Sequence, residues 1–164
     1  MFPEDVRTLA ETVLALARDR RQMLATAESC TGGLVAGALT AIAGSSEVVT
    51  GGFVTYSNQA KQALLGVDAA LIERFGAVSE PVARAMAGGA VKATGADLAV
   101  AVTGVAGPGG GSAEKPVGLV HFAVAAGQGG IDHREERFGD IGRDAVRLAS
   151  VRVALQMLRA RLSS

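Results

Sequence analysis

The residues best suited to chemistry fall in three short segments rich in small and polar residues: residues 29–33 (SCTGG), 56–58 (YSN) and 103–111 (TGVAGPGGG). Ser29 stands between an apolar segment expected to be a strand and the start of an expected helix. A serine in this position can attack a carbonyl carbon while unpaired N–H groups at the helix N-terminus hold the oxyanion. Capping of the helix by Ser29 or Thr31 is the alternative, because both residue types are favoured caps.

An activated serine needs a base to take its proton. The two histidines, His121 and His133, lie within expected strands and not after strand ends, so the sequence gives little support to a Ser-His-Asp triad. Lys61 is the better candidate, since burial beside apolar groups lowers the pKa of a lysine toward neutrality. Tyr56 could relay a proton or orient the serine. The alternative is that Lys61 is a solvated helix lysine and Tyr56 an aromatic residue at a strand end.

The glycine-rich segment 103–111 could wrap a phosphate or a ribose with its backbone N–H groups. It matches neither the GxxxxGK[ST] pattern of a P-loop nor GxGxxG, and a plain connection between strands is the alternative. Lys115 follows it and could place a cation near a phosphate, or could be an exposed loop lysine.

Cys30 is the only cysteine, which excludes an internal disulfide and any multi-cysteine metal site. A thiol at a helix N-terminus can have a lowered pKa and compete as a nucleophile. A small buried hydrophobic residue is the favoured interpretation of Cys30.

Regular elements must position these segments. Helices are predicted at residues 3–21, 31–42, 57–66, 80–94 and around 148–162, and strands at residues 23–27, 47–56, 98–103, 117–124 and 131–138. The order strand, helix, strand, helix is typical of a βαβ unit with parallel strands. The carboxyl ends of parallel strands share one edge of a sheet, where ligands bind in open α/β folds. We therefore predict an α/β fold, a three-layer α/β/α sandwich on a mostly parallel sheet with an antiparallel edge, with residues 1–164 forming a single domain.

The composition is that of a globular protein, with 49% hydrophobic and 20% charged residues. Lys+Arg and Asp+Glu balance at 16 each, so no global field favours nucleic acid or an anionic membrane. Neither a signal peptide nor a long apolar run is present, and we expect a cytoplasmic protein. The alanine-rich helix and the terminal helices are candidate surfaces for a homodimer.

Four blocks of sequence resemble the CinA C-terminal domain family, whose members include stand-alone nicotinamide-nucleotide amidohydrolases. They are AESCTGG at 27–33, GGFVTYSN at 51–58 with Lys61 following, GAVSE at 76–80, and TGVAGPGGG at 103–111 with EKPVG at 114–118. Their order and spacing agree with the family across nearly the whole chain. One departure is that Gly139-Asp140 is followed by Ile141, with Arg143 two positions later, which weakens any role for a basic residue there.

The resemblance implies hydrolysis of the carboxamide of nicotinamide mononucleotide, a small pyridine nucleotide, to nicotinate mononucleotide and ammonia, with no metal or organic cofactor. The family's catalytic serine, tyrosine and lysine correspond to Ser29, Tyr56 and Lys61. A nucleotide-binding regulatory module without catalysis is the alternative, and a protein-interaction domain is a third possibility. The residues expected to bind the substrate or its oxyanion are Cys30, Thr31, Gly32, Gly33, Asn58, Thr103, Gly104, Gly107, Gly109, Gly110 and Lys115.

Overall fold

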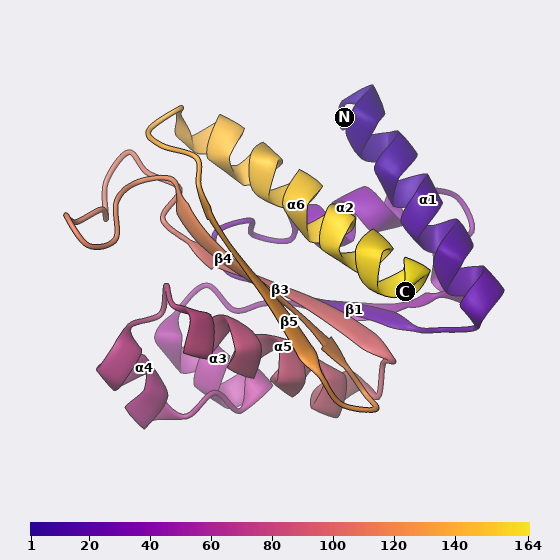
Figure 1. The fold of residues 1–164 in the computed structure, drawn as a ribbon, viewed down its shortest axis with the longest axis horizontal. Coiled ribbons are helices and arrows are strands. Elements are labelled where there is room, and N and C mark those ends of the chain that lie inside the picture. The colour runs from indigo at the N-terminus through magenta and orange to yellow at the C-terminus, as the bar shows by residue number, and fades with distance from the viewer.

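A computed structural model describes residues 1–164, which form a five-stranded sheet between two layers of helices (Figure 1). The strands are β1 (Leu24–Glu28), β2 (Val49–Val54), β3 (Leu98–Gly104), β4 (Leu119–Ala126) and β5 (Ile131–Arg137). The helices are α1 (Glu4–Arg20), α2 (Leu34–Thr40), α3 (Asn58–Leu65), α4 (Ala69–Phe75), α5 (Glu80–Thr94) and α6 (Arg143–Ser163), with a 3-10 turn at Ser45–Glu47. No helix is long and apolar enough to cross a membrane.

The strand order is β2-β1-β3-β4-β5. Strand β1 pairs in parallel with both β2 and β3, whereas β4 is antiparallel to both β3 and β5. Four strands therefore share one direction, and the carboxyl ends of β1, β2 and β3 meet at one edge. The predicted α/β sandwich with a mostly parallel sheet is confirmed, as is the polar edge strand β5.

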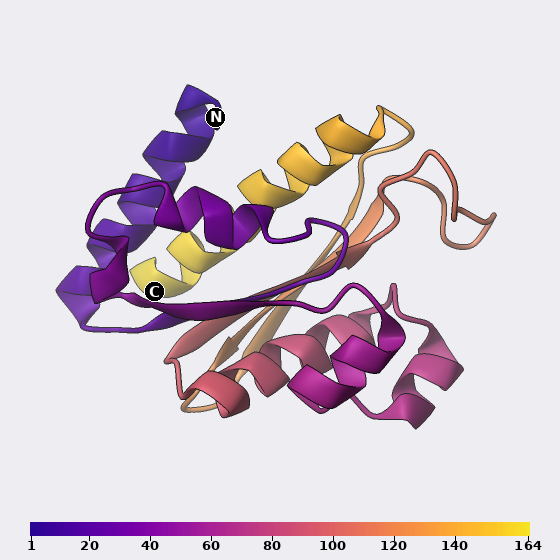
Figure 2. The ribbon, with the colours of Figure 1, turned by 180° about the vertical axis from the view of Figure 1, so that it is seen from behind.

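The two faces of the sheet are covered by different helices. Helices α1, α2 and α6 pack on one face, and α3, α4 and α5 pack on the other (Figures 1 and 2). The second face of the sheet is built from alanines, and small side chains let helices come close to the strands. Those buried alanines are Ala25, Ala27, Ala99, Ala101, Ala123 and Ala125.

The close packing extends to the contact between α3 and α5. A Cβ at Gly89 of α5 would lie 2.0 Å from the carbonyl oxygen of Leu65 in α3, so only glycine fits there. Helix α3 is therefore held tightly against α5 beside the carboxyl edge of the sheet. This contact positions Lys61, which lies on the first turn of α3.

Three elements differ from the sequence predictions. Helix α6 begins at Arg143, before the predicted start near residue 148. The helix predicted at 31–42 is the shorter α2, because Gly32 and Gly33 have φ values of +58° and +99° and form a turn before it. Helix α4 was not predicted; it has only seven residues, capped by the Asp68 side chain, and is too short to show a clear helical period.

Candidate active site

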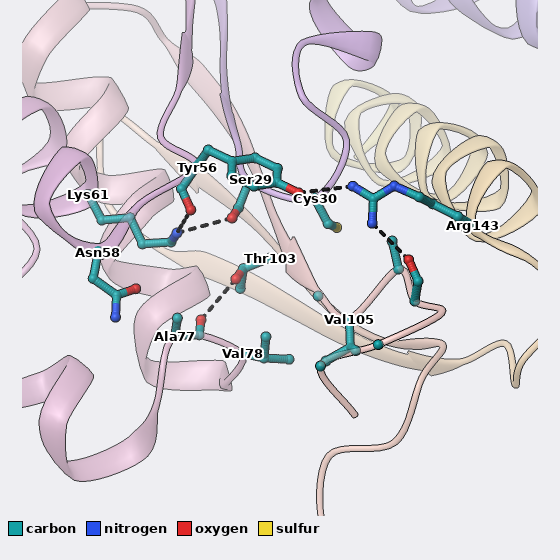
Figure 3. Close-up of a pocket in the computed structure, with 15 residues that line it drawn as sticks. Ser29, Cys30, Tyr56, Asn58, Lys61, Ala77, Val78, Thr103, Val105 and Arg143 are labelled. Atoms are coloured by element: carbon teal, nitrogen blue, oxygen red, sulfur yellow. Dashed lines mark hydrogen bonds between the residues drawn. The ribbon is translucent and has the colours of Figure 1, made fainter. Parts of the chain in front are cut away.

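A cavity of about 290 Å³ opens at the carboxyl edge of the parallel strands (Figure 3). All three predicted segments contribute to its lining, which supports the expectation that they converge there. Four residues predicted to bind the substrate, Thr31, Gly32, Gly33 and Lys115, do not line it. The predicted site residues that do line it are Ser29, Cys30, Tyr56, Asn58, Lys61, Thr103, Gly104, Gly107, Gly109 and Gly110.

Ser29 is the first residue after β1. Its N–H donates to the carbonyl oxygen of Val102 at 2.9 Å, which continues the ladder with β3 and fixes the serine backbone. The Nζ atom of Lys61 lies 3.0 Å from Ser29 Oγ, and the lysine is only 1% exposed. The interpretation of Lys61 as a solvated helix lysine is therefore wrong.

The hydrogen bonds of Lys61 favour a role as a base. Nζ donates to the carbonyl oxygens of Thr55 at 2.8 Å and Tyr56 at 3.4 Å. Carbonyl oxygens only accept, so in the neutral amine these two bonds use both N–H groups and leave the lone pair facing the Ser29 hydroxyl. Burial lowers the pKa of Lys61 from its ordinary 10.5, because the charged form loses its hydration.

The N-terminus of α2 is capped by neither Ser29 nor Thr31, contrary to the capping alternative. The fully buried Glu28 carboxylate accepts the N–H groups of Val35 at 2.8 Å and Ala36 at 3.0 Å instead. A carboxylate at this helix end is stabilised by the unpaired amides and by the helix dipole. Because Glu28 takes these donors, the first N–H groups of α2 are not available to an oxyanion.

The donors left free belong to the turn between Ser29 and α2. The Gly32 N–H closes this turn by donating to the carbonyl oxygen of Ser29 at 3.0 Å. The N–H groups of Cys30 and Thr31 have no acceptor within the chain. Of these two residues only Cys30 lines the cavity, so the Cys30 N–H is the candidate oxyanion donor next to Ser29.

Cys30 lines the cavity but is only 5% exposed. Burial raises the pKa of its thiol to about 12, since the thiolate would be poorly solvated. A thiol in this state is a weak nucleophile, and the structure favours Ser29 over Cys30.

Tyr56 lies at the mouth of the cavity and is 60% exposed. Its hydroxyl accepts a hydrogen bond from Arg143 Nη2 at 2.9 Å and forms none with Ser29 or Lys61 (Figure 3). The role of Tyr56 in proton transfer thus stays a prediction, and the contact seen is with an arginine that the sequence analysis had discounted.

Arg143 begins α6 and lines the cavity, donating also to the carbonyl oxygen of Gly107 at 2.8 Å. The departure after Asp140 was expected to weaken any role for a basic residue there, but the first turn of α6 returns to the site and places Arg143 in the lining. A signal was present in the sequence, since Arg143 and Arg147 are spaced four apart and so share one face of the helix.

The glycine-rich loop after β3 forms the wall opposite Ser29. The N–H groups of Ala106, Gly107, Gly109 and Gly110 have no acceptor within the chain. Besides Lys61, the lining contains the cation Arg143 and no carboxylate. Free amide donors and uncompensated positive charge make this wall suitable for an anionic group.

Lys115 was expected to help bind the substrate, but it does not line this wall of the cavity. Its Nζ donates to the carbonyl oxygen of Phe75 at the C-terminus of α4, away from the cavity. Two apolar residues, Ala77 and Val78, line the cavity without having been predicted, and the Thr103 hydroxyl holds them by donating to the carbonyl oxygen of Ala77 at 2.9 Å.

The histidines lie outside the cavity. His121 Nδ1 and His133 Nε2 are 2.9 Å apart on β4 and β5 and do not contact Ser29. No group of three or more His, Cys, Asp or Glu side chains is arranged to hold a metal ion.

Comparison with known proteins agrees with this architecture. Residues 6–162 match the family model described as the CinA C-terminal domain. A CinA-like protein of Synechococcus sp. (strain RCC307) is 59% identical over 162 residues, and one of Mycobacterium marinum is 53% identical over 163. The alignments cover 98% and 99% of this chain but only 39% and 38% of those relatives, so the chain spans about two fifths of their length.

Solved structures match over their full length. The competence/damage inducible protein CihA from Agrobacterium tumefaciens is 56% identical, with a TM-score of 0.97 and coverage of 100% of this chain and 99% of that one. A CinA superfamily protein from Klebsiella pneumoniae is 37% identical, with a TM-score of 0.91 and coverage of 96% and 98%. The chain belongs to the CinA C-terminal domain family.

Proposed function

We propose that this domain hydrolyses the carboxamide of nicotinamide mononucleotide, giving nicotinate mononucleotide and ammonia. The observation that carries the proposal is the buried Lys61 amine, 3.0 Å from the Ser29 hydroxyl. A serine paired with a desolvated amine is an arrangement for acyl transfer, because the amine can take the serine proton. The choice of a pyridine nucleotide comes from the family resemblance and is supported by the charge of the cavity.

In the first half of the reaction, Ser29 Oγ attacks the carboxamide carbon while its proton passes to neutral Lys61. The carbonyl oxygen becomes an oxyanion, which the free N–H group of Cys30 stabilises. Each donor of this kind contributes roughly 3–4 kcal/mol to the transition state. As the tetrahedral intermediate collapses, protonated Lys61 gives its proton to the leaving nitrogen, and ammonia departs.

In the second half, a water molecule attacks the acyl-serine ester and transfers a proton to Lys61. The same N–H group holds the second oxyanion. When the intermediate collapses, the Ser29 oxygen leaves and regains its proton from Lys61. The carboxylic acid formed in this step loses the remaining water proton to solvent, so the products are the carboxylate, a proton and free enzyme, and the reaction balances without a cofactor.

The lining of the cavity supports binding of the remaining parts of the proposed substrate. Arg143 and the free N–H groups of Gly109 and Gly110 suit the phosphate, which binds most strongly where charged and amide donors converge. The exposed Tyr56 ring is available to stack on the positively charged pyridinium. At about 290 Å³ the open cavity is near the lower limit of typical ligand sites, which are about 300–1,000 Å³.

The proposal is tested by incubating the purified domain with nicotinamide mononucleotide and measuring ammonia and the nicotinate nucleotide chromatographically. Wild type should release both in equal amounts, while Ser29→Ala should release neither. Thermal stabilisation of wild type by the nucleotide without turnover would support the non-catalytic binding module instead. Near-normal ammonia release by Ser29→Ala would show that another group is the nucleophile.

A further inference from the structure

The turn after Ser29 is held by a charged side chain that the proposed chemistry does not use. Arg147 reaches it from α6, where Nε donates to the carbonyl oxygen of Cys30 at 3.1 Å and Nη2 to that of Thr31 at 3.3 Å. Arg147 forms no ion pair with a carboxylate. Its guanidinium is therefore committed to two backbone carbonyls within the turn.

Holding a carbonyl also fixes the orientation of an N–H group. In a planar trans peptide the C=O of one residue and the N–H of the next point in opposite directions. Because Arg147 binds the Cys30 carbonyl, the Thr31 N–H is turned away from the guanidinium. The Thr31 carbonyl belongs to the same peptide as the Gly32 N–H, so Arg147 also directs that N–H, which donates to the Ser29 carbonyl. The Cys30 N–H, in the same peptide as the Ser29 carbonyl, is thereby turned out of the turn.

Both of these N–H groups lie in buried residues and lack an acceptor within the chain. Unpaired buried N–H groups are costly, and a relaxed turn would rotate its peptides to pair them. The contacts from Arg147 prevent that rotation directly for the Cys30–Thr31 peptide and, through the Gly32 N–H, for the Ser29–Cys30 peptide. An N–H next to the nucleophile is a common oxyanion donor in serine hydrolases, so the orientation that Arg147 maintains is the one that catalysis needs.

We infer that Arg147 is a positioning residue that holds the Cys30 N–H in place for the oxyanion by fixing the turn between Ser29 and α2. This role rests on the proposed function, because the oxyanion exists only if Ser29 attacks a carbonyl. Gly32 takes part in the same arrangement. A Cβ at Gly32 would lie 3.1 Å from Arg147 Nη2, so the absence of a side chain lets the guanidinium approach the turn.

The test compares Arg147→Met, which keeps the aliphatic packing of the side chain, with Arg159→Met on an exposed part of the same helix. With nicotinamide mononucleotide, Arg147→Met should lose about 100-fold in kcat. Its KM should stay within about twofold, because the oxyanion develops only in the transition state. The kcat of Arg147→Lys should lie between those of wild type and Arg147→Met. Guanidinium ion added at millimolar concentration should restore part of the activity of Arg147→Met.

A second readout separates this inference from the choice of substrate. A fluorophosphonate forms a bond between Ser29 Oγ and phosphorus as fluoride leaves and the serine proton passes to Lys61, and its phosphoryl oxygen needs the same donor. If wild type fails to hydrolyse the nucleotide but reacts with this probe, the substrate proposal fails while slower labelling of Arg147→Met still supports the inference. The inference would be overturned if a folded Arg147→Met had the kcat and labelling rate of wild type, or if only its KM changed. If Arg147→Met does not fold, the kcat and labelling rate of Arg147→Lys and Gly32→Ala are compared with those of wild type instead.

Discussion

The two walls of the cavity are built in opposite ways. On one side, the turn after β1 is held by paired groups: Glu28 caps the helix behind it and Arg147 binds its carbonyls. On the other side, residues 108–114 of the glycine-rich loop are exposed, and the N–H groups of Gly109 and Gly110 have no acceptor in the chain. The first wall is fixed before substrate arrives, and the second leaves its donors free for it.

This difference separates the tasks of the site. Bond making and breaking need reacting groups held within a fraction of an ångström, which the paired turn and the buried Lys61 provide. Binding an anionic group needs free donors and positive charge, which the loop and Arg143 provide. Substitutions on the first wall should therefore lower kcat, and substitutions on the second should raise KM.

The largest effect is expected from Lys61→Met. Removing the base while keeping an apolar chain of similar length should lower kcat by about 10⁴-fold, the upper range for general-base catalysis. Steady-state ammonia release measures this, and Lys92→Met in the last turn of α5 is a control distant from the cavity. A Lys61→Met variant with more than a tenth of wild-type kcat would remove the lysine from the mechanism.

The second effect concerns the binding wall. Arg143→Ala should raise the KM for the nucleotide by about 10- to 100-fold, because a charged hydrogen bond contributes about 1.5–3 kcal/mol and each 1.4 kcal/mol is tenfold. The matched control is Lys115→Ala, which removes a cation that contacts Phe75 and not the cavity. Equal KM values for Arg143→Ala and Lys115→Ala would contradict the division between the two walls.

The pH dependence of kcat tests which protonation state of Lys61 is active. Lys61 accepts the serine proton only when it is neutral, so kcat should rise about tenfold per pH unit below its pKa and then level off. Since burial lowers this pKa, the plateau should begin below the ordinary value of 10.5. A kcat that falls as the pH is raised from neutral would mean that protonated Lys61 is the active form.

The smallest effect on turnover, but a clear one on stability, is expected from Glu28→Ala. The change leaves the N–H groups of Val35 and Ala36 buried without their acceptor. The free energy of unfolding should fall by about 1–3 kcal/mol, as for a lost cap or an unpaired buried group. Urea denaturation measures this, and Glu11→Ala on the exposed face of α1 should change stability little.

Local sequence signals were sufficient to predict every strand, every helix except α4, and the convergence of the three segments. The prediction that Lys61 lies near this edge rested on the end of the preceding strand and on Ser57 and Gly66, which cap the two ends of α3. Contacts between distant segments were not predictable in this way. Arg147 meets Cys30 across 117 residues of sequence, and Lys115 turned toward α4 because the path of a glycine-rich loop depends on tertiary packing.

The central claim, that Ser29 and Lys61 act as one unit, is tested most directly by a double-mutant cycle. The kcat of wild type, Ser29→Ala, Lys61→Met and the double variant would be measured with nicotinamide mononucleotide under identical conditions. Groups that act together give non-additive losses, so the double variant should be no slower than the slower single variant. Losses that multiply in the double variant would show that the two residues act independently and would contradict the proposed mechanism.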